Sequence, residues 1–270
     1  MTVSAVDFQY VRRLVAQESA LTLSDGKEYL VQSRLAPVAE RQGLASVTEL
    51  IERLRVGAPE LRREVVEALA IHETLFFRDV HPFEALRREV IPAILRANGG
   101  RGLSMWSAGT STGQEAYSMA LLLREHFPHV TGATVLGTDI SRQVLARAKT
   151  ATFSQLEVNR GLPAALLVKH FAQHGRDWQL HDDVRRMVEF RQLNLARPLA
   201  GIPPMDVVFL RNVLIYFDAD AKRAVLERVT RILLPGAHLF LGGADTLSGL
   251  EDSYERIQSG RSISFRRVDR

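Results

Sequence analysis

The chain has 270 residues, with 35 Lys or Arg and 31 Asp or Glu, and because the basic residues are scattered along it, the net charge of +4 predicts no nucleic-acid partner. It contains no Cys, which excludes disulfides, thiolate metal sites and cysteine nucleophiles and favours a reducing compartment. No apolar stretch approaches the roughly 20 residues that cross a bilayer, and the first residues lack a signal-peptide pattern, so we expect a cytoplasmic protein without membrane insertion.

The first 84 residues predict an all-α helical domain. Apolar side chains recur there at spacings close to the 3.6-residue period of a helix, and breaks at Asp25-Gly26, Gly43 and Gly57-Ala58-Pro59 separate them into groups. The groups span residues 8–14, 30–38, 47–54 and 61–69. We therefore expect four helices in residues 1–84.

From residue 85 to residue 270, strand and helix patterns alternate, which is typical of a Rossmann-like α/β domain. A helix through residues 86–94 is expected to end at Asn98-Gly99-Gly100. The expected strands are residues 103–107, 134–138, 187–193, 206–210 and 238–241, and the expected helices are 114–127, 143–148 and 219–233. Residues 254–258 and 262–266 predict a closing antiparallel hairpin. The alternation predicts a mostly parallel sheet that binds ligands at the carboxyl ends of its strands.

The stretch 153–190 is longer than a simple crossover requires, so we expect a small inserted subdomain there. Gly161-Leu162-Pro163 predicts the start of a helix that continues through Phe171, and residues 178–180 are expected to pair with 184–190 as a small β excursion. His170 and His174 would then share one face of that helix. Two histidines without a third ligand do not make a metal site, so we expect no metal and interpret both as surface residues.

Two motifs at predicted strand ends indicate a nucleoside-containing cofactor. Gly109 and Gly113 lie between an apolar strand and a helix, and glycines there leave room for a nucleoside because they lack a Cβ. The next apolar strand ends in Asp139, whose carboxylate is suited to accept hydrogen bonds from a ribose diol. Without any ligand, Asp139 is also suited to cap the next helix together with Ser141, and Glu115 is favourable near a helix N-terminus.

Five motifs follow one another in an order that is specific to one family. They are residues 73–79, 106–117, 137–141, 194–195 and 210–217, and residues 234–236 with 241–243 form a closing signature. Together they resemble the CheR family of chemotaxis receptor methyltransferases over nearly the whole chain. The resemblance implies a protein-glutamate O-methyltransferase that uses S-adenosylmethionine, releases S-adenosylhomocysteine and needs no metal.

The resemblance also implies roles for individual residues. The implied cofactor contacts are His72 (where the family usually has Asn), Thr74, Arg78, Glu115, Asp139, Asn194, Leu195, Arg211 and Asn212. Asp139 would hold the ribose hydroxyls, and Asn194 with Leu195 would read and flank the adenine. Glu115 would meet the methionine ammonium, and Arg78 would pair with the methionine carboxylate.

The reacting centre and the partner follow from the same resemblance. Tyr216 and Arg78 are implied as catalytic residues, with the Tyr216 hydroxyl orienting the acceptor carboxylate. The implied partner is the cytoplasmic helical domain of methyl-accepting chemoreceptors, with Arg34 and Arg41 as candidate docking cations on a helix that is normally more basic. Residues 172–177 predict a loop shorter than in members that grip a C-terminal receptor pentapeptide, so we expect no tight pentapeptide binding.

Two other functions fit parts of the sequence. Residues 109–113 match the G-x-S-x-G nucleophile elbow of α/β hydrolases, but a triad with Ser111 requires a His after the last strand, and none follows His238. A non-catalytic signalling protein that binds S-adenosylmethionine or S-adenosylhomocysteine would have the same fold. The presence of Arg211, Asn212 and Tyr216 beside the expected methyl position favours turnover.

Overall fold

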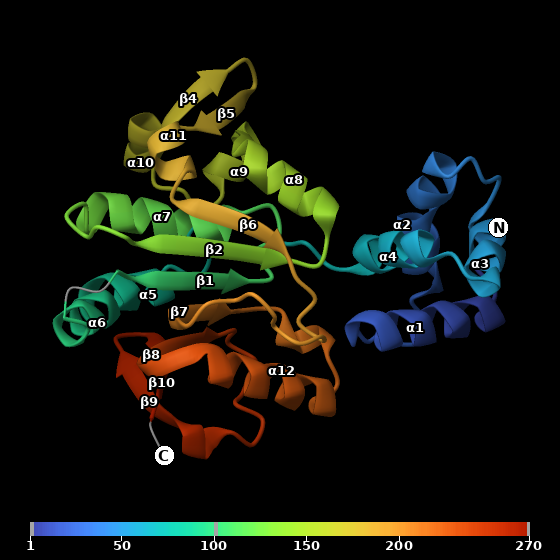
Figure 1. The fold of residues 1–270 in the computed structure, drawn as a ribbon. Coiled ribbons are helices and arrows are strands. Elements are labelled where there is room, and N and C mark those ends of the chain that lie inside the picture. Colours follow the sequence, from blue (N-terminus) through green and yellow to red (C-terminus); the bar gives the residue numbers. More distant parts are fainter. Residues whose placement is uncertain (1–2, 100–101, 269–270) are drawn as a thin grey trace.

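The computed structural model describes residues 3–99 and 102–268, and it places a helical domain beside a larger α/β domain (Figure 1). The helical domain contains α1 (Ala5–Ser19), α2 (Glu28–Arg41), α3 (Val47–Val56) and α4 (Pro59–Leu69). These helices confirm the four predicted from the apolar spacing. Their apolar faces meet in one buried cluster that includes Phe8, Leu35, Ile51 and Val65.

The chain after the helical domain leads into three consecutive helical segments. They are α5 (His81–Ala85), the π-helical η1 (Leu86–Val90) and α6 (Ile91–Ala97). The single helix predicted here is thus interrupted by a π turn, because Pro92 in the first turn of α6 has no N–H with which to continue regular bonding. Helix α6 ends at Ala97 with Asn98 as its C-cap, as predicted, whereas Gly100 of the predicted stop lies outside the described residues.

A sheet of seven strands, counted over the described residues, forms the centre of the α/β domain in the order β6-β2-β1-β7-β8-β10-β9. The strands are β1 (Ser104–Ala108), β2 (Thr134–Asp139), β6 (Val188–Gln192), β7 (Met205–Leu210), β8 (Leu233–Leu241), β9 (Tyr254–Ser259) and β10 (Ser262–Arg267). Neighbours from β6 to β8 pair in parallel, and β10 is antiparallel to both β8 and β9. The strand order reverses between β1 and β7, where such sheets form a binding crevice.

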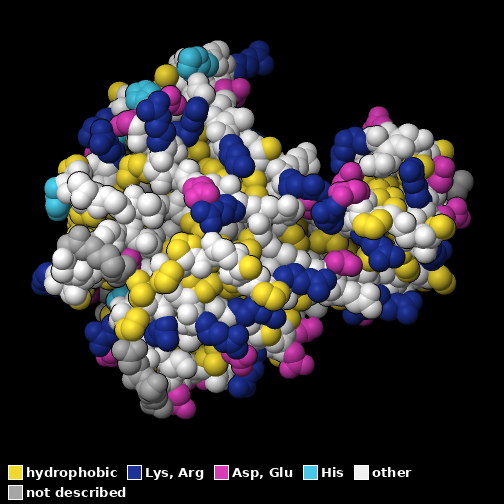
Figure 2. Space-filling model, in the orientation of Figure 1, with side chains coloured by type: hydrophobic (Ala, Val, Ile, Leu, Met, Phe, Trp, Pro, Cys, Tyr) yellow, Lys and Arg dark blue, Asp and Glu magenta, His cyan; other side chains and the backbone are white. Residues whose placement is uncertain are grey.

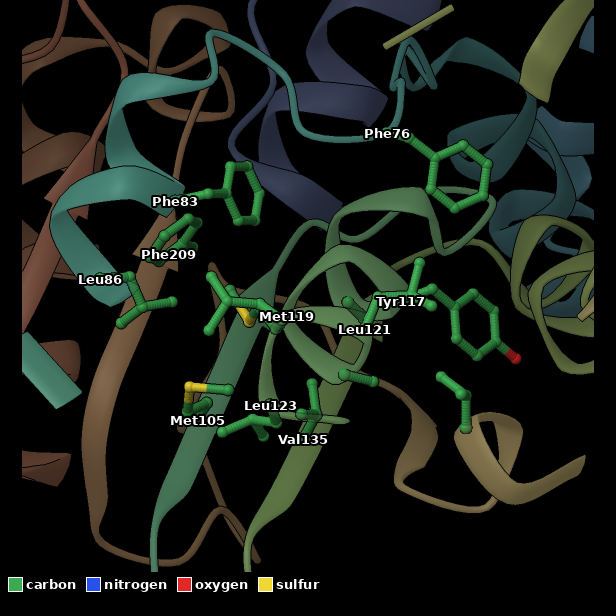
Figure 3. Close-up of a cluster of buried hydrophobic side chains, with 14 of the residues drawn as sticks. Phe76, Phe83, Leu86, Met105, Tyr117, Met119, Leu121, Leu123, Val135 and Phe209 are labelled. Carbon is green, nitrogen blue, oxygen red and sulfur yellow. The ribbon is translucent and has the colours of Figure 1, made fainter. Parts of the chain in front are cut away.

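Buried side chains cover both faces of this sheet because successive residues of a strand point to opposite sides. Met105 and Phe209 belong to the cluster on one face, whereas Trp106 and Val208 belong to the cluster on the other. Figure 3 shows part of the first cluster, in which Phe83 from α5 lies against Phe209 with 5.3 Å between ring centroids. The helices that connect the strands are α7 (Gln114–His126), α8 (Arg142–Thr150) and α12 (Ala219–Ile232).

The small β excursion exists, but its predicted pairing is wrong. The excursion contains β3 (Thr152–Ser154), α9 (Gln155–Asn159), α10 (Ala164–His170), β4 (Phe171–His174), β5 (Asp177–Leu180) and α11 (Asp182–Arg185). Strand β5 pairs with β3 and β4, and residues 188–192 belong to β6 of the main sheet. Gly175, with a φ of 64°, lets the chain turn straight back from β4 into β5. Residues 172–177 are therefore a β hairpin rather than a loop, and it projects from the domain in Figure 1.

His170 and His174 do not share a helix face, and the surface interpretation is wrong for His170. Helix α10 ends at His170, whereas His174 ends strand β4. His170 is buried, and its Nε2 lies 2.7 Å from Glu125 Oε1, which also accepts a hydrogen bond from Lys169 Nζ. Hydrogen bonding to Lys169, with a smaller contribution from His170, lowers the pKa of Glu125. The two histidines thus have separate structural settings.

Over residues 3–99 and 102–268, no three His, Asp or Glu side chains cluster in a way that would hold a metal ion. No helix within these residues combines the length and apolar character needed to span a membrane. Figure 2 shows acidic and basic side chains intermingled on the face that it presents.

Candidate functional site

The turn between β1 and α7 is held against the end of β2 by backbone hydrogen bonds. The N–H groups of Gly109 and Thr110 both donate to the carbonyl oxygen of Thr138 at 2.8 Å. Gly109 has a φ of 78°, and a Cβ there would lie 2.5 Å from a methyl carbon of Val213. Glycine is therefore required, but Val213 fills the space that a side chain would take.

Asp139 closes the same turn from the end of β2. Its Oδ2 accepts a hydrogen bond from the Ser111 N–H at 2.9 Å, and its Oδ1 accepts one from the Ser141 N–H at 3.1 Å. Ser141, not Asp139, is the N-cap of α8, since its side chain accepts the Val144 N–H. A carboxylate can accept about four hydrogen bonds, so Asp139 keeps acceptor capacity for a ligand.

A pocket at the carboxyl ends of β1, β2 and β7 brings most of the predicted site residues together. Those that line it are His72, Asp139, Asn194, Leu195, Arg211, Asn212 and Tyr216. The other lining residues include Ser19 and Leu21 from the helical domain and Val213 and Phe217 from the segment after β7. The predicted binding crevice at the strand ends is therefore present in the structure.

The helical domain closes one side of this pocket, which the sequence analysis missed. Thr22 donates both its backbone N–H and its hydroxyl to the carbonyl oxygen of Tyr216, at 2.8 and 2.9 Å. Leu21 forms an isolated antiparallel bridge with Phe217. The only sequence signal is the alternation of Leu21, Thr22 and Leu23 after the first helix, which is too short to predict a strand.

Asn194 lines the pocket next to the end of α1. Its Nδ2 donates to the carbonyl oxygen of Glu18 at 2.7 Å, and its Oδ1 accepts the N–H of Ala196 at 3.0 Å. Leu195 beside it packs into the buried cluster on the α12 side of the sheet. Asn194 thus links the two domains. A hydrogen bond between its amide and the adenine of a cofactor stays a prediction.

Arg211, just after the end of β7, connects α7 to the segment between the two domains. This junction segment spans residues 73–80, and its turn lies around Arg78. Its Nη1 donates to Glu115 Oε2 at 3.1 Å, and its Nη2 donates to the carbonyl oxygen of Arg78 at 3.0 Å and to the carboxylate of Asp79. Its guanidinium carbon lies 5.7 Å from the centre of the Phe209 ring, within range of a cation–π contact. Arg211 therefore fixes the conformation of the junction turn relative to the sheet.

Glu115 is buried in the first turn of α7 behind the pocket. Its Oε1 accepts a hydrogen bond from Ser107 Oγ at 2.8 Å, and its Oε2 pairs with Arg211. Burial raises the pKa of Glu115, whereas the charge and hydrogen bond of Arg211, the Ser107 hydroxyl and the charge of Arg78 oppose that rise. Glu115 does not line the pocket. It is connected to the pocket through its ion pair with Arg211, which does line it.

Thr74 and Arg78 lie on the junction segment and are not among the lining residues of the pocket. Both are half-buried, and Arg78 Nη1 donates to the carbonyl oxygen of Glu73 at 3.1 Å. The turn around Arg78 is strained, since its non-glycine residues Phe77, Asp79 and Val80 have φ values of 47°, 66° and 47°. Contacts of Thr74 and Arg78 with a cofactor stay predictions.

The surroundings of Ser111 do not support the hydrolase alternative. A serine nucleophile needs an imidazole that takes its proton, but the Ser111 hydroxyl donates instead to the carbonyl oxygen of His72 at 3.0 Å. The His72 ring lies close to the Glu67 carbonyl and to Asp139, at 3.2 and 3.7 Å. His238 is buried in β8, with Nδ1 3.1 Å from Ser264 Oγ.

Comparisons with known proteins agree with this fold and site. A family model described as the SAM-binding domain of CheR methyltransferases matches residues 72–263, and one described as their all-alpha domain matches residues 6–70. The chain is 38% identical to chemotaxis protein methyltransferase 1 of Pseudomonas aeruginosa and to chemotaxis protein methyltransferase Cher2 of Pseudomonas putida, each alignment covering 98% of this chain and 99% of the relative. It is 34% identical to the chemotaxis protein methyltransferase of Vibrio anguillarum, over 98% of both chains.

Proposed function

Because the chain belongs to the CheR methyltransferase family, and both of that family's domains are present, we propose that it transfers a methyl group from S-adenosylmethionine to glutamate carboxylates of methyl-accepting chemotaxis receptors. The observation that carries this proposal is the pocket at the reversal of strand order. Asp139, Asn194 and Arg211 line it from the ends of three different parallel strands or from just beyond them. Residues far apart in sequence thus share one crevice.

The residues in and behind this pocket fit S-adenosylmethionine. Asp139 has acceptor capacity for a ribose diol, and Asn212 Oδ1 is a buried acceptor without a hydrogen-bond partner in the part of the chain that the structure describes. Arg211 lines the pocket and supplies a cation for the carboxylate end, and Glu115 lies behind it as its ion-pair partner. When bound, the cofactor supplies a reactive methyl group on a positively charged sulfur.

The chain's own task in this reaction is positioning. A glutamate side chain has a pKa near 4.3 and is ionised at neutral pH, so no residue has to remove a proton from it. Leu21, Val213 and Phe217 give the pocket an apolar wall that excludes water. Tyr216 is half-buried in the same wall, and its hydroxyl is suited to orient the acceptor carboxylate.

Methyl transfer from radiolabelled S-adenosylmethionine to receptor-containing membranes tests the proposal. The expected product is a label on the receptor that mild base releases, because glutamate methyl esters are base-labile. Tyr216→Phe keeps the ring and removes the hydroxyl, and it should lower kcat at least about tenfold because a hydrogen bond to a charged group is lost.

The affinity for S-adenosylhomocysteine, measured by calorimetry, is the control and should stay unchanged in Tyr216→Phe. If the protein binds this compound but labels no receptor, the non-catalytic binding protein becomes the better description. If the label resists base, the acceptor is not a carboxylate.

A further inference from the structure

His72 lines the pocket beside the carboxylate that is expected to hold the ribose of the cofactor. It lies in the loop after α4, and its backbone carbonyl accepts a hydrogen bond from the Ser111 hydroxyl at 3.0 Å. Its side chain is 22% exposed, and both His72 and Asp139 belong to the pocket wall. The imidazole is therefore within reach of a ligand that occupies the pocket.

The hydrogen bond of the His72 ring fixes which of its nitrogens carries the proton. Nε2 lies 3.2 Å from the carbonyl oxygen of Glu67 in α4. A carbonyl oxygen only accepts hydrogen bonds, so this contact requires the proton of the neutral ring on Nε2. Nδ1 then carries a lone pair, and the neutral ring presents an acceptor there.

Nδ1 of His72 and the carboxylate of Asp139 offer two acceptors side by side. Nδ1 lies 3.7 Å from Asp139 Oδ1, too far for a hydrogen bond, and it has no hydrogen-bond partner among the residues that the structure describes. One hydroxyl carries one hydrogen and satisfies one of these acceptors. A vicinal diol brings two donors, so a ribose is suited to donate one hydrogen bond to the carboxylate and the other to the imidazole.

Protonation of His72 removes this arrangement. Histidine is the side chain that changes charge between pH 5 and pH 8, and the imidazolium carries a proton on both nitrogens. Nδ1 then becomes a donor that faces Asp139, which already accepts the N–H groups of Ser111 and Ser141 at 2.9 and 3.1 Å. A charged ring would therefore pair with the carboxylate and no longer accept a hydroxyl of the diol.

The other charged groups on the elements around the ring already have partners. The pairs are Glu67 with Arg142, Glu73 with Arg160, and Arg211 with Glu115 and Asp79. Asp139 has no Lys or Arg within ion-pair distance in the part of the chain that the structure describes. It is therefore the carboxylate with which a protonated His72 would pair.

We propose that His72 and Asp139 hold the ribose diol together, that the cofactor binds to the neutral imidazole, and that its binding releases a proton where His72 is charged. The proposal rests on the proposed function, which supplies a ribose to this pocket. It adds to that function an affinity for the cofactor that falls as the pH drops. The sign follows because the ligand prefers the state with fewer protons, whereas acid favours the state with more.

Calorimetry of S-adenosylhomocysteine binding at pH 5.5 and pH 7.5 measures this linkage. At each pH, titrations in two buffers with different ionisation enthalpies give the number of protons released. The wild type should release a larger fraction of a proton at pH 5.5 than at pH 7.5. Its affinity should be about threefold to tenfold weaker at pH 5.5, because one hydrogen bond of the diol is lost. Equal affinities without proton release would overturn the proposal.

Two variants separate the acceptor from the titrating group. His72→Asn can present an amide oxygen near the position of Nδ1 but does not titrate, so it should keep about the wild-type affinity at pH 7.5 and lose the proton release. His72→Gln reaches toward Glu67 as Nε2 does but offers no acceptor beside Asp139, so its affinity at pH 7.5 should be about threefold to tenfold weaker. If both variants bind equally tightly, His72 accepts no hydroxyl and the proposal is wrong.

His174→Gln is the matched control, because His174 is exposed at the end of β4 and does not line the pocket. This variant should keep the proton release of the wild type. Proton release that persists in His72→Asn would come from another group, such as Glu115, whose pKa is raised by burial. That result would overturn the proposal.

The role of His72 and the proposed function fail in different ways in these experiments. If the protein binds no S-adenosylhomocysteine at pH 7.5, the proposed function fails and the role of His72 fails with it. If the protein binds this compound and methylates a receptor but releases no proton at either pH, the proposed function stands and the role of His72 is overturned.

Discussion

Arg211 holds together two carboxylates that come from separate parts of the chain. Glu115 lies in α7 and Asp79 in the junction turn, and both contact the same guanidinium. The side chain of Arg211 is only 2% exposed, so loss of its charge would leave Glu115 buried without its ion-pair partner. One residue therefore couples the conformation of the junction to the electrostatics behind the pocket at the strand ends.

His238 gives the fold a dependence on pH that is separate from the reaction. Burial lowers its pKa to about 4, with a further contribution from Arg266 and an opposing one from Glu255. In the unfolded chain a histidine has a pKa near 6.5, so below that pH the unfolded state binds a proton that the folded state excludes until about pH 4. Stability therefore falls as the pH drops through this window, by about 2 kcal/mol between pH 7 and pH 5 from this residue.

His238→Gln should therefore reduce the pH dependence of the free energy of unfolding. Urea titrations at pH 7 and pH 5 should differ by about 2 kcal/mol less in this variant than in the wild type. His129→Gln serves as the control because His129 is exposed, and it should keep the wild-type difference. An unchanged difference in His238→Gln would mean that other groups carry the pH dependence.

Single site residues were predictable where a strand end positions them. Asp139 ends an apolar run, Asn194 follows a run of alternating apolar and polar residues, and these runs form adjacent parallel strands that bring both side chains to the pocket. The pairing of Arg211 with Asp79 was not predictable, because it depends on positive φ values at Phe77 and Val80, residue types that rarely adopt them.

At the scale of whole elements, the central parallel strands β2 and β7 were predictable because each is a short, nearly continuous apolar run, whereas β6 at the sheet edge shows alternating apolar and polar residues. The β excursion was mispaired for two reasons. Helix α10 passes directly into β4 without a Gly or Pro, so the sequence gives no signal for the change at Phe171. The pairing of β3 with β5 is non-local, and the apolar residues near 188–190 are buried by the main sheet instead.

Helix α2 is attached to α4 through Arg34, which was a candidate docking cation. Its Nη1 donates to the carbonyl oxygens of Leu69 and Ala70 at the C-terminal end of α4, both at 2.8 Å. These carbonyls have no partner within their own helix, so a cation there satisfies them and interacts favourably with the helix dipole. We therefore expect Arg34→Ala to lower the free energy of unfolding by about 2 kcal/mol, as measured by urea titration.

Arg41 on the same helix provides the matched comparison. It is exposed at the last turn of α2, and Arg41→Ala should change the free energy of unfolding by less than about 0.5 kcal/mol. Reduced receptor methylation in Arg41→Ala would then report on docking, whereas the same loss in Arg34→Ala would also reflect stability. If Arg34→Ala is as stable as Arg41→Ala, Arg34 does not hold α4 in solution.

At the scale of the whole molecule, the helical domain is bound to the α/β domain around the pocket that we propose for the cofactor. Thr22 contacts Tyr216 on one side, and Glu18 contacts Asn194 on the other. Further along the interface, Glu67 of α4 accepts hydrogen bonds from the backbone N–H and the side chain of Arg142. The pocket therefore has walls from both domains, and it opens if they separate.

Ligand binding should consequently protect a part of the helical domain from hydrogen exchange. With S-adenosylhomocysteine at about 100 times its Kd, any opening that disrupts the pocket costs about 2.7 kcal/mol more, which slows exchange through that opening about a hundredfold. Mass spectrometry should detect this protection at residues 17–24 as well as at 193–197. Helix α3 does not line the pocket and is the internal control, which should change less. Protection confined to the α/β domain would show that the helical domain opens without disturbing the site.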